Sequence, residues 1–219
     1  MTVKNYLFLF LLMVNFNLNA QKKNSDPMSE ATFKGLKLRN VGPAFTSGRI
    51  ADIAIHPEDD NVWYVAVGSG GVWKTENAGT TWMPIFDDQP VYSTGCITLD
   101  PSNPHTVWLG TGENVGGRHV GFGDGIYKSP DGGKTWKNMG LKKSEHISKI
   151  IVHPDNPNIL WVAAQGPLWS KGGERGLYKS IDGGKTWNKT LGDSEWTGVT
   201  DILIDPRNPD VLYLSLIHI

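Results

Sequence analysis

The sequence predicts an all-β protein, a β-propeller built from four-stranded antiparallel blades. The first observation is an octapeptide of the form Ser-x-Asp-x-Gly-x-Thr-Trp, which begins at Ser129 and again 51 residues later at Ser180 (129 to 180). A looser copy begins 54 residues earlier, at Thr75 (75 to 129). The second observation is a series of short apolar segments, each ending in His-Pro or Asp-Pro. Recurrence at this period is typical of repeat architectures, among them propellers.

The octapeptide has the chemistry of a tight turn. Its Ser or Thr hydroxyl and its Asp or Asn side chain can fold back onto backbone N–H groups. Its glycine suits a position with positive φ, and its tryptophan can pack the turn against its neighbours. We therefore expect structural roles for Thr75, Asn77, Gly79 and Trp82 in the first copy, Ser129, Asp131, Gly133 and Trp136 in the second, and Ser180, Asp182, Gly184 and Trp187 in the third.

Each blade should begin with an apolar strand that stops at the His-Pro or Asp-Pro pair, because proline cannot donate to a β-ladder. A second strand with an aromatic residue, a short third strand and, from the Thr-Trp of the octapeptide, a fourth strand should follow. The alternation of His and Asp at these turns indicates turn capping rather than metal binding. The expected first strands are Ile50–Ile55, Cys96–Leu99, Ile147–Val152 and Val199–Ile204, the aromatics are Trp63, Trp108, Trp161 and Tyr213, and the third strands are Val72–Thr75, Gly125–Lys128 and Gly176–Lys179.

The repeat divides the chain into blades at about 38–86, 87–140 and 141–191, with an incomplete blade at 192–219. Propellers close with typically four to eight blades, so we expect about three and a half blades of a larger propeller, as its N-terminal fragment. The last few residues lack the glycine-rich turn expected after a second strand, which leaves open whether they are native sequence.

The N-terminus predicts a signal peptide at 1–20 and a flexible leader at 21–37. Lys4 precedes the apolar run Tyr6–Val14, and the small residue Ala20 follows. The run is shorter than the roughly 20 residues that span a bilayer. We therefore expect a secreted, periplasmic or cell-envelope protein, with cleavage near Ala20 and no membrane span afterwards.

The net charge limits the classes of partner, and the cysteine content bears on the core. Lys and Arg number 21 against 22 Asp and Glu, for a net charge of −1, which gives no basic surface for nucleic acid. The single cysteine, Cys96, lies in an apolar strand and is expected in the core. No metal-ligand spacing is present, so no cofactor is expected, although calcium held by loop oxygens stays open.

The octapeptide resembles the Asp-box, or bacterial neuraminidase repeat, which implies a structural turn between the third and fourth strands of a blade. Several other runs resemble exported Bacteroidetes proteins, often labelled glycosyl hydrolases, whose domain is similar to the ten-bladed N-terminal propeller of sortilin. That resemblance covers nearly all of 38–213 and implies the fold and an extracellular or periplasmic setting, but it carries over no catalytic residue. The runs are Arg39–Pro43, Ser47–Pro57, Val67–Lys74, Gly110–Asn114 and Ala164–Trp169.

Propeller topology puts the loops between strands two and three, and those between blades, on one face. We call it the long-loop face; it comprises residues 42–49, 68–71, 87–95, 112–124, 141–146, 165–175 and 192–198. Function is usually carried by loops on a rigid scaffold. The residues expected to bind a ligand there are Arg49, Glu113, Arg118, His119, Asp124, Trp169, Arg175 and Trp196.

Two acids on this face could form the carboxylate pair that sugar hydrolysis requires, namely Glu113 and Glu174. The competing interpretation is that Arg118 and Arg175 pair with these acids and only order the loops. Most tryptophans occupy repeat positions and suit packing between blades, which leaves Trp169 and Trp196 as platforms for sugar stacking.

The principal hypothesis for function is an exported, sortilin-like propeller that serves as a binding scaffold for a peptide, protein or glycan on the long-loop face. The alternative is a sialidase-like or endo-glucanase-like glycoside hydrolase that uses paired carboxylates. A structural module of a secretion or adhesion system is a third possibility. The sequence leaves open whether the protein is an enzyme.

Overall fold

The computed structural model describes residues 30–36, 49–114 and 120–219. The chain divides into two compact units, Met1–Asn40 and Val41–Ile219. Within the first, the described part contains the one-turn helix α2 (Glu30–Phe33). The expected signal peptide, and Arg118 and His119 of the expected site, lie outside the described residues.

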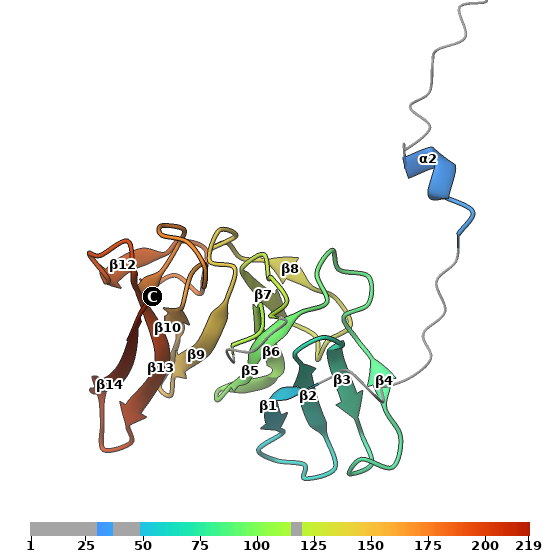
Figure 1. The fold of residues 1–219 in the computed structure, drawn as a ribbon. Coiled ribbons are helices and arrows are strands. Elements are labelled where there is room, and N and C mark those ends of the chain that lie inside the picture. The colour runs from blue at the N-terminus through green and yellow to red at the C-terminus, as the bar shows by residue number, and fades with distance from the viewer. Residues whose placement is uncertain (1–29, 37–48, 115–119) are drawn as a thin grey trace, which may run out of the picture. The chain divides into compact units, whose positions relative to one another are not determined.

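The larger unit is all-β, as the sequence predicts, and consists of three four-stranded antiparallel sheets followed by a two-stranded sheet. Figure 1 shows the sheets following one another in chain order, as blades do. The first sheet is β1 (Ile50–Ile55), β2 (Trp63–Val67), β3 (Gly71–Thr75) and β4 (Met83–Pro84); the second is β5 (Thr94–Asp100), β6 (Asn103–Thr111), β7 (Ile126–Ser129) and β8 (Lys137–Asn138); the third is β9 (Ile147–His153), β10 (Asn156–Ala164), β11 (Gly176–Ser180) and β12 (Asn188–Leu191); the last is β13 (Thr197–Asp205) and β14 (Asn208–His218).

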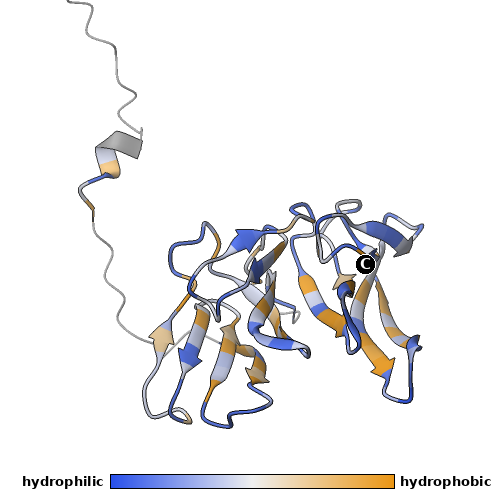
Figure 2. Cartoon of the chain, turned by 180° about the vertical axis from the view of Figure 1, so that it is seen from behind, coloured by the Kyte–Doolittle hydropathy of each residue, from blue (hydrophilic) through white to orange (hydrophobic). Residues whose placement is uncertain are grey.

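Strand order within every four-stranded sheet follows the chain, so neighbouring strands are joined by hairpins. The first strands of successive sheets also touch: β5 contacts both β1 and β9, and β9 contacts β13. The hydrophobic residues concentrate on the strands, while the turns at the strand ends are mostly hydrophilic (Figure 2). This arrangement matches a propeller in which each sheet is one blade.

The His-Pro and Asp-Pro pairs form capped turns, as predicted. At His56, Asp100, His153 and Asp205 the side chain accepts a hydrogen bond from the backbone N–H two residues later, at 3.2, 2.9, 3.1 and 2.9 Å. Imidazole and carboxylate thus serve the same purpose in different blades.

The octapeptide turns share one hydrogen-bond pattern. Ser129 Oγ donates to Asp131 Oδ1 and accepts from Gly133 N, both at 2.8 Å. The third copy repeats both bonds at 2.8 Å, and the looser first copy repeats them at 3.0 and 2.9 Å. Hydrogen bonds from the backbone and hydroxyl of Thr135 help to lower the Asp131 carboxyl pKa to about 2. The fourth strands begin just after each tryptophan rather than at the Thr-Trp pair.

The tryptophan of the second and third octapeptides ties its blade to the blade before it. Trp136 Nε1 donates to Ile85 O at 2.6 Å, and Trp187 Nε1 donates to Met139 O at 2.8 Å. Both acceptors lie just after the fourth strand of the preceding sheet. The octapeptide therefore closes its own turn and fixes the spacing between blades.

Replacing Ser129 with alanine is expected to lower the free energy of unfolding by about 1–3 kcal/mol, because it leaves the buried N–H of Gly133 without its acceptor. Urea denaturation would measure the change. Ser102, an exposed serine whose hydroxyl donates to the Asp100 side chain, is the matched control, and its alanine variant should stay within about 0.5 kcal/mol of the parent. Equal effects at the two serines would contradict this role for the octapeptide.

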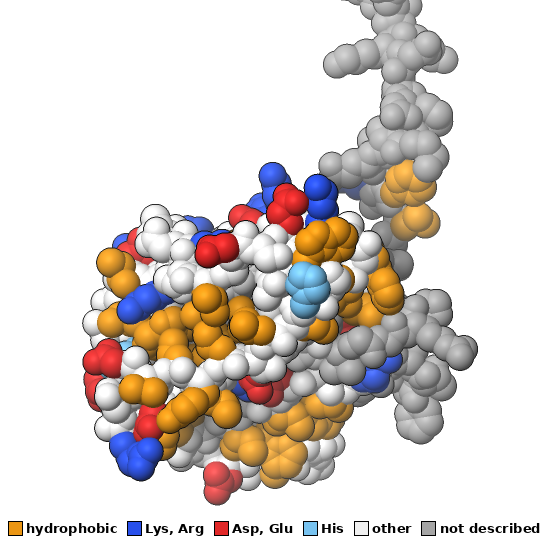
Figure 3. Space-filling view, turned by 60° about the vertical axis from the view of Figure 1, so that its left-hand side comes forward, with side chains coloured by type: hydrophobic (Ala, Val, Ile, Leu, Met, Phe, Trp, Pro, Cys, Tyr) orange, Lys and Arg blue, Asp and Glu red, His pale blue; other side chains and the backbone are white. Residues whose placement is uncertain are grey.

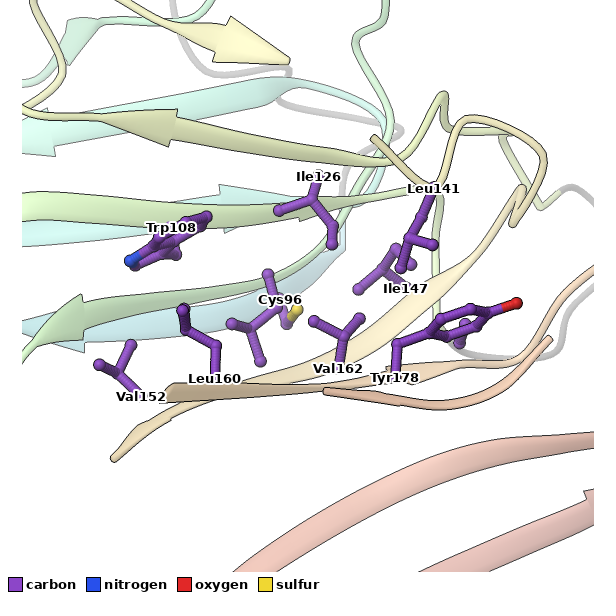
Figure 4. Packing of buried hydrophobic residues seen from close by; sticks show 11 residues of the cluster. Cys96, Trp108, Ile126, Leu141, Ile147, Val152, Leu160, Val162 and Tyr178 are labelled. Carbon is purple, nitrogen blue, oxygen red and sulfur yellow. The ribbon is translucent and has the colours of Figure 1, made fainter. Parts of the chain in front are cut away.

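Hydrophobic side chains fill the spaces between successive sheets. Figure 4 shows the cluster between the second and third sheets, where Trp108 and Cys96 face Leu160 and Val162. Cys96 is 2% exposed, which confirms its expected place in the core, and this burial raises the pKa of its thiol to about 12. Figure 3 shows hydrophobic side chains exposed on the side of β13 and β14. Leu203 of β13 and Tyr213 of β14 are exposed hydrophobic residues of these strands.

The prediction of which aromatic residue occupies the shared position in blade one was wrong by one residue. Tyr64 rather than Trp63 is the equivalent of Trp108, because Tyr64 is 1% exposed and pairs across the sheet with Lys74. Lys74 lies over the Tyr64 ring at 5.4 Å, as Lys128 lies over Trp108 at 4.7 Å. Trp63 instead packs edge-on against Trp82 of its own blade.

Candidate functional site

The backbone of Glu113 is anchored on the long-loop face where the first two blades meet. Its N–H donates to Gly121 O at 3.0 Å and to Ser93 Oγ at 3.1 Å. Ser93 Oγ also lies 2.9 Å from Gly68 O, in the loop between β2 and β3. Three segments, from two blades and the linker between them, therefore fix the position of Glu113.

The Glu113 side chain is 2% exposed and pairs with Arg49, whose side chain is 52% exposed. Arg49 Nε donates to Glu113 Oε1 at 2.7 Å, and Arg49 Nη2 contacts the same oxygen. A Cβ on Gly68 would lie 2.6 Å from Oε1, so this glycine makes room for the carboxylate. Glu113 Oε2 is buried and has no hydrogen-bond partner among the described residues.

His146 connects the next linker to Glu113. It is fully buried, and its Nδ1 lies 2.8 Å from Glu113 O. Burial lowers the pKa of the imidazole, against the opposing influence of Glu113. Since a neutral ring that donates from Nδ1 has its lone pair on Nε2, this nitrogen is an acceptor, and no described residue donates to it.

The backbone of Glu145 packs against the loop that carries Glu113. Its backbone carbonyl oxygen accepts from Gly123 N at 2.8 Å, and a Cβ on Gly112 would overlap that carbonyl oxygen. Glu145 itself has φ of 59°, a conformation uncommon for a residue other than glycine. Burial raises the pKa of its carboxyl, although the nearby Arg175 opposes the shift. The segments that carry Glu113 and Glu145 are therefore in close backbone contact.

Sequence reasoning missed both Glu145 and His146. They occur once, in a linker whose polar residues have no periodicity. The prediction that 141–146 belongs to the long-loop face pointed to this linker but not to these two residues. Their relation to Glu113 arises from the packing of one blade against the next.

Replacing Glu145 with glutamine is expected to raise the melting temperature slightly at pH 7. The folded-state pKa is raised above 4.5, so the stability associated with protonation is present below about pH 4.5 and is lost as the pH rises through the folded value. Glutamine stays neutral throughout. Melting curves of parent and variant should therefore converge at pH 4, and a difference that does not change with pH would contradict the shift.

Four other residues expected at the site lie in different surroundings: two are hydrogen-bonded acids and two are exposed tryptophans. Asp124 Oδ2 accepts from Tyr127 OH at 2.8 Å. Glu174 Oε2 accepts from Lys143 N at 2.7 Å. Trp169 and Trp196 are 76% and 40% exposed.

Arg175 does not pair with Glu174, which corrects one of the sequence interpretations. Arg175 is 1% exposed, and its guanidinium donates to backbone carbonyls of its own loop, because that loop folds around it. Whether Arg118 pairs with Glu113 lies outside the described residues, but Arg49 does so.

Unpartnered polar atoms concentrate on this face. Buried polar groups in folded proteins are normally hydrogen-bonded, so each exception calls for an explanation. Apart from Trp108 Nε1, the exceptions among the described residues are Glu113 Oε2, Asn114 Oδ1, Asp124 Oδ1, Ser144 Oγ, His146 Nε2 and Arg175 Nη1.

Within residues 30–36, 49–114 and 120–219, no group of three or more His, Cys, Asp or Glu side chains is arranged to hold a metal ion. Nor does the described part of the chain contain a helix long and apolar enough to cross a membrane.

No protein-family model matches the chain. Among curated proteins, it is 24% identical over 185 residues to a probable oligoxyloglucan-reducing end-specific xyloglucanase of Neosartorya fischeri, covering 77% of this chain and 21% of that protein. It is 27% identical over 191 residues to a xyloglucanase of Hypocrea jecorina, covering 81% and 21%. The chain thus spans about a fifth of the length of these relatives.

Solved structures show the same fold. An ancestral GH74 enzyme matches with a TM-score of 0.60 and 19% identity, over 78% of this chain and 22% of that one. The GH74 enzyme of Niastella koreensis matches with a TM-score of 0.57 and 20% identity, over 76% and 26%. These matches show the propeller fold, and they do not extend the resemblance to sortilin.

These findings contradict the principal hypothesis of a binding scaffold. The curated relatives are named as xyloglucanases, and the similar folds include GH74 enzymes. The alternative, a glycoside hydrolase, agrees better with both comparisons.

Proposed function

We propose that this chain forms part of a propeller glycoside hydrolase that acts on a β-glucan of the xyloglucan type. The observation that carries the proposal is the similarity of about three quarters of the chain to named xyloglucanases. The long-loop face supports it, because a fixed, buried carboxylate lies there among unpartnered polar atoms and exposed tryptophans. A glycan is accordingly the proposed ligand.

Two carboxyl groups in different environments are the chemical requirement for glycoside hydrolysis. Glu113 is held against the Arg49 guanidinium and keeps one oxygen unpartnered among the described residues, which suits the carboxylate that stabilises or attacks the sugar. Glu145, whose pKa burial raises, suits the acid that protonates the leaving oxygen. The segments that carry them are in contact, because His146 bonds to the Glu113 carbonyl and Gly112 packs against the Glu145 carbonyl.

Glu174 is the weaker counterpart, because one of its oxygens is engaged by Lys143 N. One assay distinguishes Glu145 from Glu174 as the acid. Reducing ends released from xyloglucan by the full-length protein would be measured for the parent, Glu145→Gln and Glu174→Gln. We expect Glu145→Gln to lose on the order of 10²- to 10⁴-fold in kcat and Glu174→Gln to change little.

A parent protein that releases no reducing ends from xyloglucan or other β-glucans would overturn the proposed function. A Glu174→Gln variant as damaged as Glu145→Gln would overturn only the assignment of the acid.

We further propose that the octapeptide turns are Asp-boxes of the kind found in neuraminidase and sortilin-type propellers. Their repeated Ser–Asp–Gly hydrogen bonds support this. Export through a signal peptide cleaved near Ala20 belongs to the same proposal, and N-terminal sequencing of secreted protein, with Gln21 as the expected first residue, would test it.

A further inference from the structure

Trp169 lies on a short loop of the third blade, residues 166–174, which we call the Trp169 loop. The side chain is 76% exposed, although most tryptophans at the repeat positions pack between or within blades. The loop is also tied to the following linker: Gly172 N donates to Glu195 O at 2.8 Å, and Lys171 Nζ lies 3.3 Å from Glu195 Oε2. That linker carries the second exposed tryptophan of this face, Trp196.

Arg175 donates three hydrogen bonds to the backbone of the Trp169 loop. Its Nε donates to Gly172 O at 2.7 Å, and its Nη2 donates to Pro167 O at 2.8 Å and to Ser170 O at 2.7 Å. The acceptors lie on both sides of Trp169 in the sequence. A Cβ on Gly166 would lie 2.6 Å from Arg175 Cβ, so the loop wraps closely around this side chain.

Stability alone does not account for this arrangement. A buried guanidinium without a hydrogen-bonded carboxylate is costly, and an apolar side chain of similar volume is often at least as stable. Glu145 contributes only a longer-range attraction, and burial lowers the Arg175 pKa. Arg175 Nη1 has no partner among the described residues.

We propose that Arg175 is a positioning residue, which keeps the Trp169 loop in one conformation so that the exposed indole serves as a stacking platform for a sugar ring of the glycan. Arg175 does not touch the sugar itself. Planar aromatic groups commonly line ligand sites, and a platform that is ordered before binding avoids the entropy cost of ordering it on binding. The inference rests on the proposed function for the identity of the ligand and on the contacts of Arg175 for the mechanism.

The binding test uses the full-length protein and a xyloglucan oligosaccharide, with affinity measured by isothermal titration calorimetry. Arg175→Met keeps the length of the side chain but cannot donate. We expect Arg175→Met and Trp169→Ala each to weaken binding by roughly five- to tenfold, and the double variant to be no weaker than Trp169→Ala, because both changes remove the same platform. Arg175→Lys keeps the charge but lacks the planar fork, and it should restore little.

A second readout follows the loop without any ligand. Lys171 is exposed within the Trp169 loop, so trypsin should cut after it several times faster in Arg175→Met than in the parent. Cleavage after Lys34, in the smaller unit, provides the internal reference.

The outcomes separate the two claims. Unchanged affinity of Arg175→Met beside a weakened Trp169→Ala would overturn the positioning role, as would independent losses that multiply in the double variant. If the parent does not bind xyloglucan, the proposed function fails. The positioning role is then decided by trypsin: faster cleavage after Lys171 in Arg175→Met supports it, and an unchanged rate overturns it.

Discussion

Replacing Glu113 with glutamine is expected to remove most hydrolytic activity and to leave the protein folded. Glutamine has the same size and keeps an oxygen that can accept from Arg49, but it carries no charge with which to stabilise or attack a reacting sugar. Loss of a positioned acid or base of this kind lowers kcat on the order of 10²- to 10⁴-fold. Initial rates on xyloglucan would measure the effect, with KM expected to change little.

The matched control is Glu76→Gln. Glu76 belongs to the first octapeptide, away from the long-loop face, and it is exposed and pairs with Lys74. Its activity should equal that of the parent. Arg49 is half exposed, so water can solvate its charge in Glu113→Gln, and the melting temperature should shift only modestly. Parental kcat in a well-folded Glu113→Gln variant would remove Glu113 from the mechanism.

Truncating Trp108 to alanine is expected to destabilise the fold more than any other single change considered, by about 3–5 kcal/mol. The indole is fully buried between the second and third sheets. Lys128 covers its ring, and a Cβ on Gly184 would lie 2.5 Å from the indole. A rigid sheet on each side cannot collapse into the space that alanine leaves. Urea denaturation of variant and parent would give the difference.

Trp169→Ala is the control for this truncation, because the same atoms are removed from an exposed position. Its unfolding free energy should stay within about 0.5 kcal/mol of the parent. A similar loss at both tryptophans would show that the cluster around Trp108 does not hold the blades together.

The regular part of the fold could be predicted because it repeats. Proline ends the first strands and the octapeptide closes the third, so the first strand of blade one was predicted with the bounds it has in the structure, Ile50–Ile55. The error at Trp63 arose where two aromatics are adjacent. Tyr64 follows His56 by eight residues, the spacing of the later blades, whereas Trp63 follows it by seven.

The site could be predicted only in part, because it depends on how blades meet. Glu113 was expected on the long-loop face, but its pairing with Arg49 joins residues 64 apart in the chain. Glu145 and His146 have no repeated counterpart that would mark them. Arg175 was expected to face a ligand, but the fold of its own loop buries it.

The chemistry was the least predictable feature. The octapeptides determine turns and blade spacing, and such turns support many functions on one fold. They therefore favoured a propeller without deciding its function, and the principal hypothesis of a scaffold was wrong. The similarity of most of the chain to named xyloglucanases favours the hydrolase instead.

The most direct test is a crystal structure of the full-length Glu113→Gln variant soaked with a xyloglucan oligosaccharide. We expect sugar on the long-loop face, with a ring beside residue 113 and another stacked on Trp169. Sugar bound only elsewhere, or no sugar at a concentration that saturates binding in solution, would contradict the proposal that this face is the glycan site.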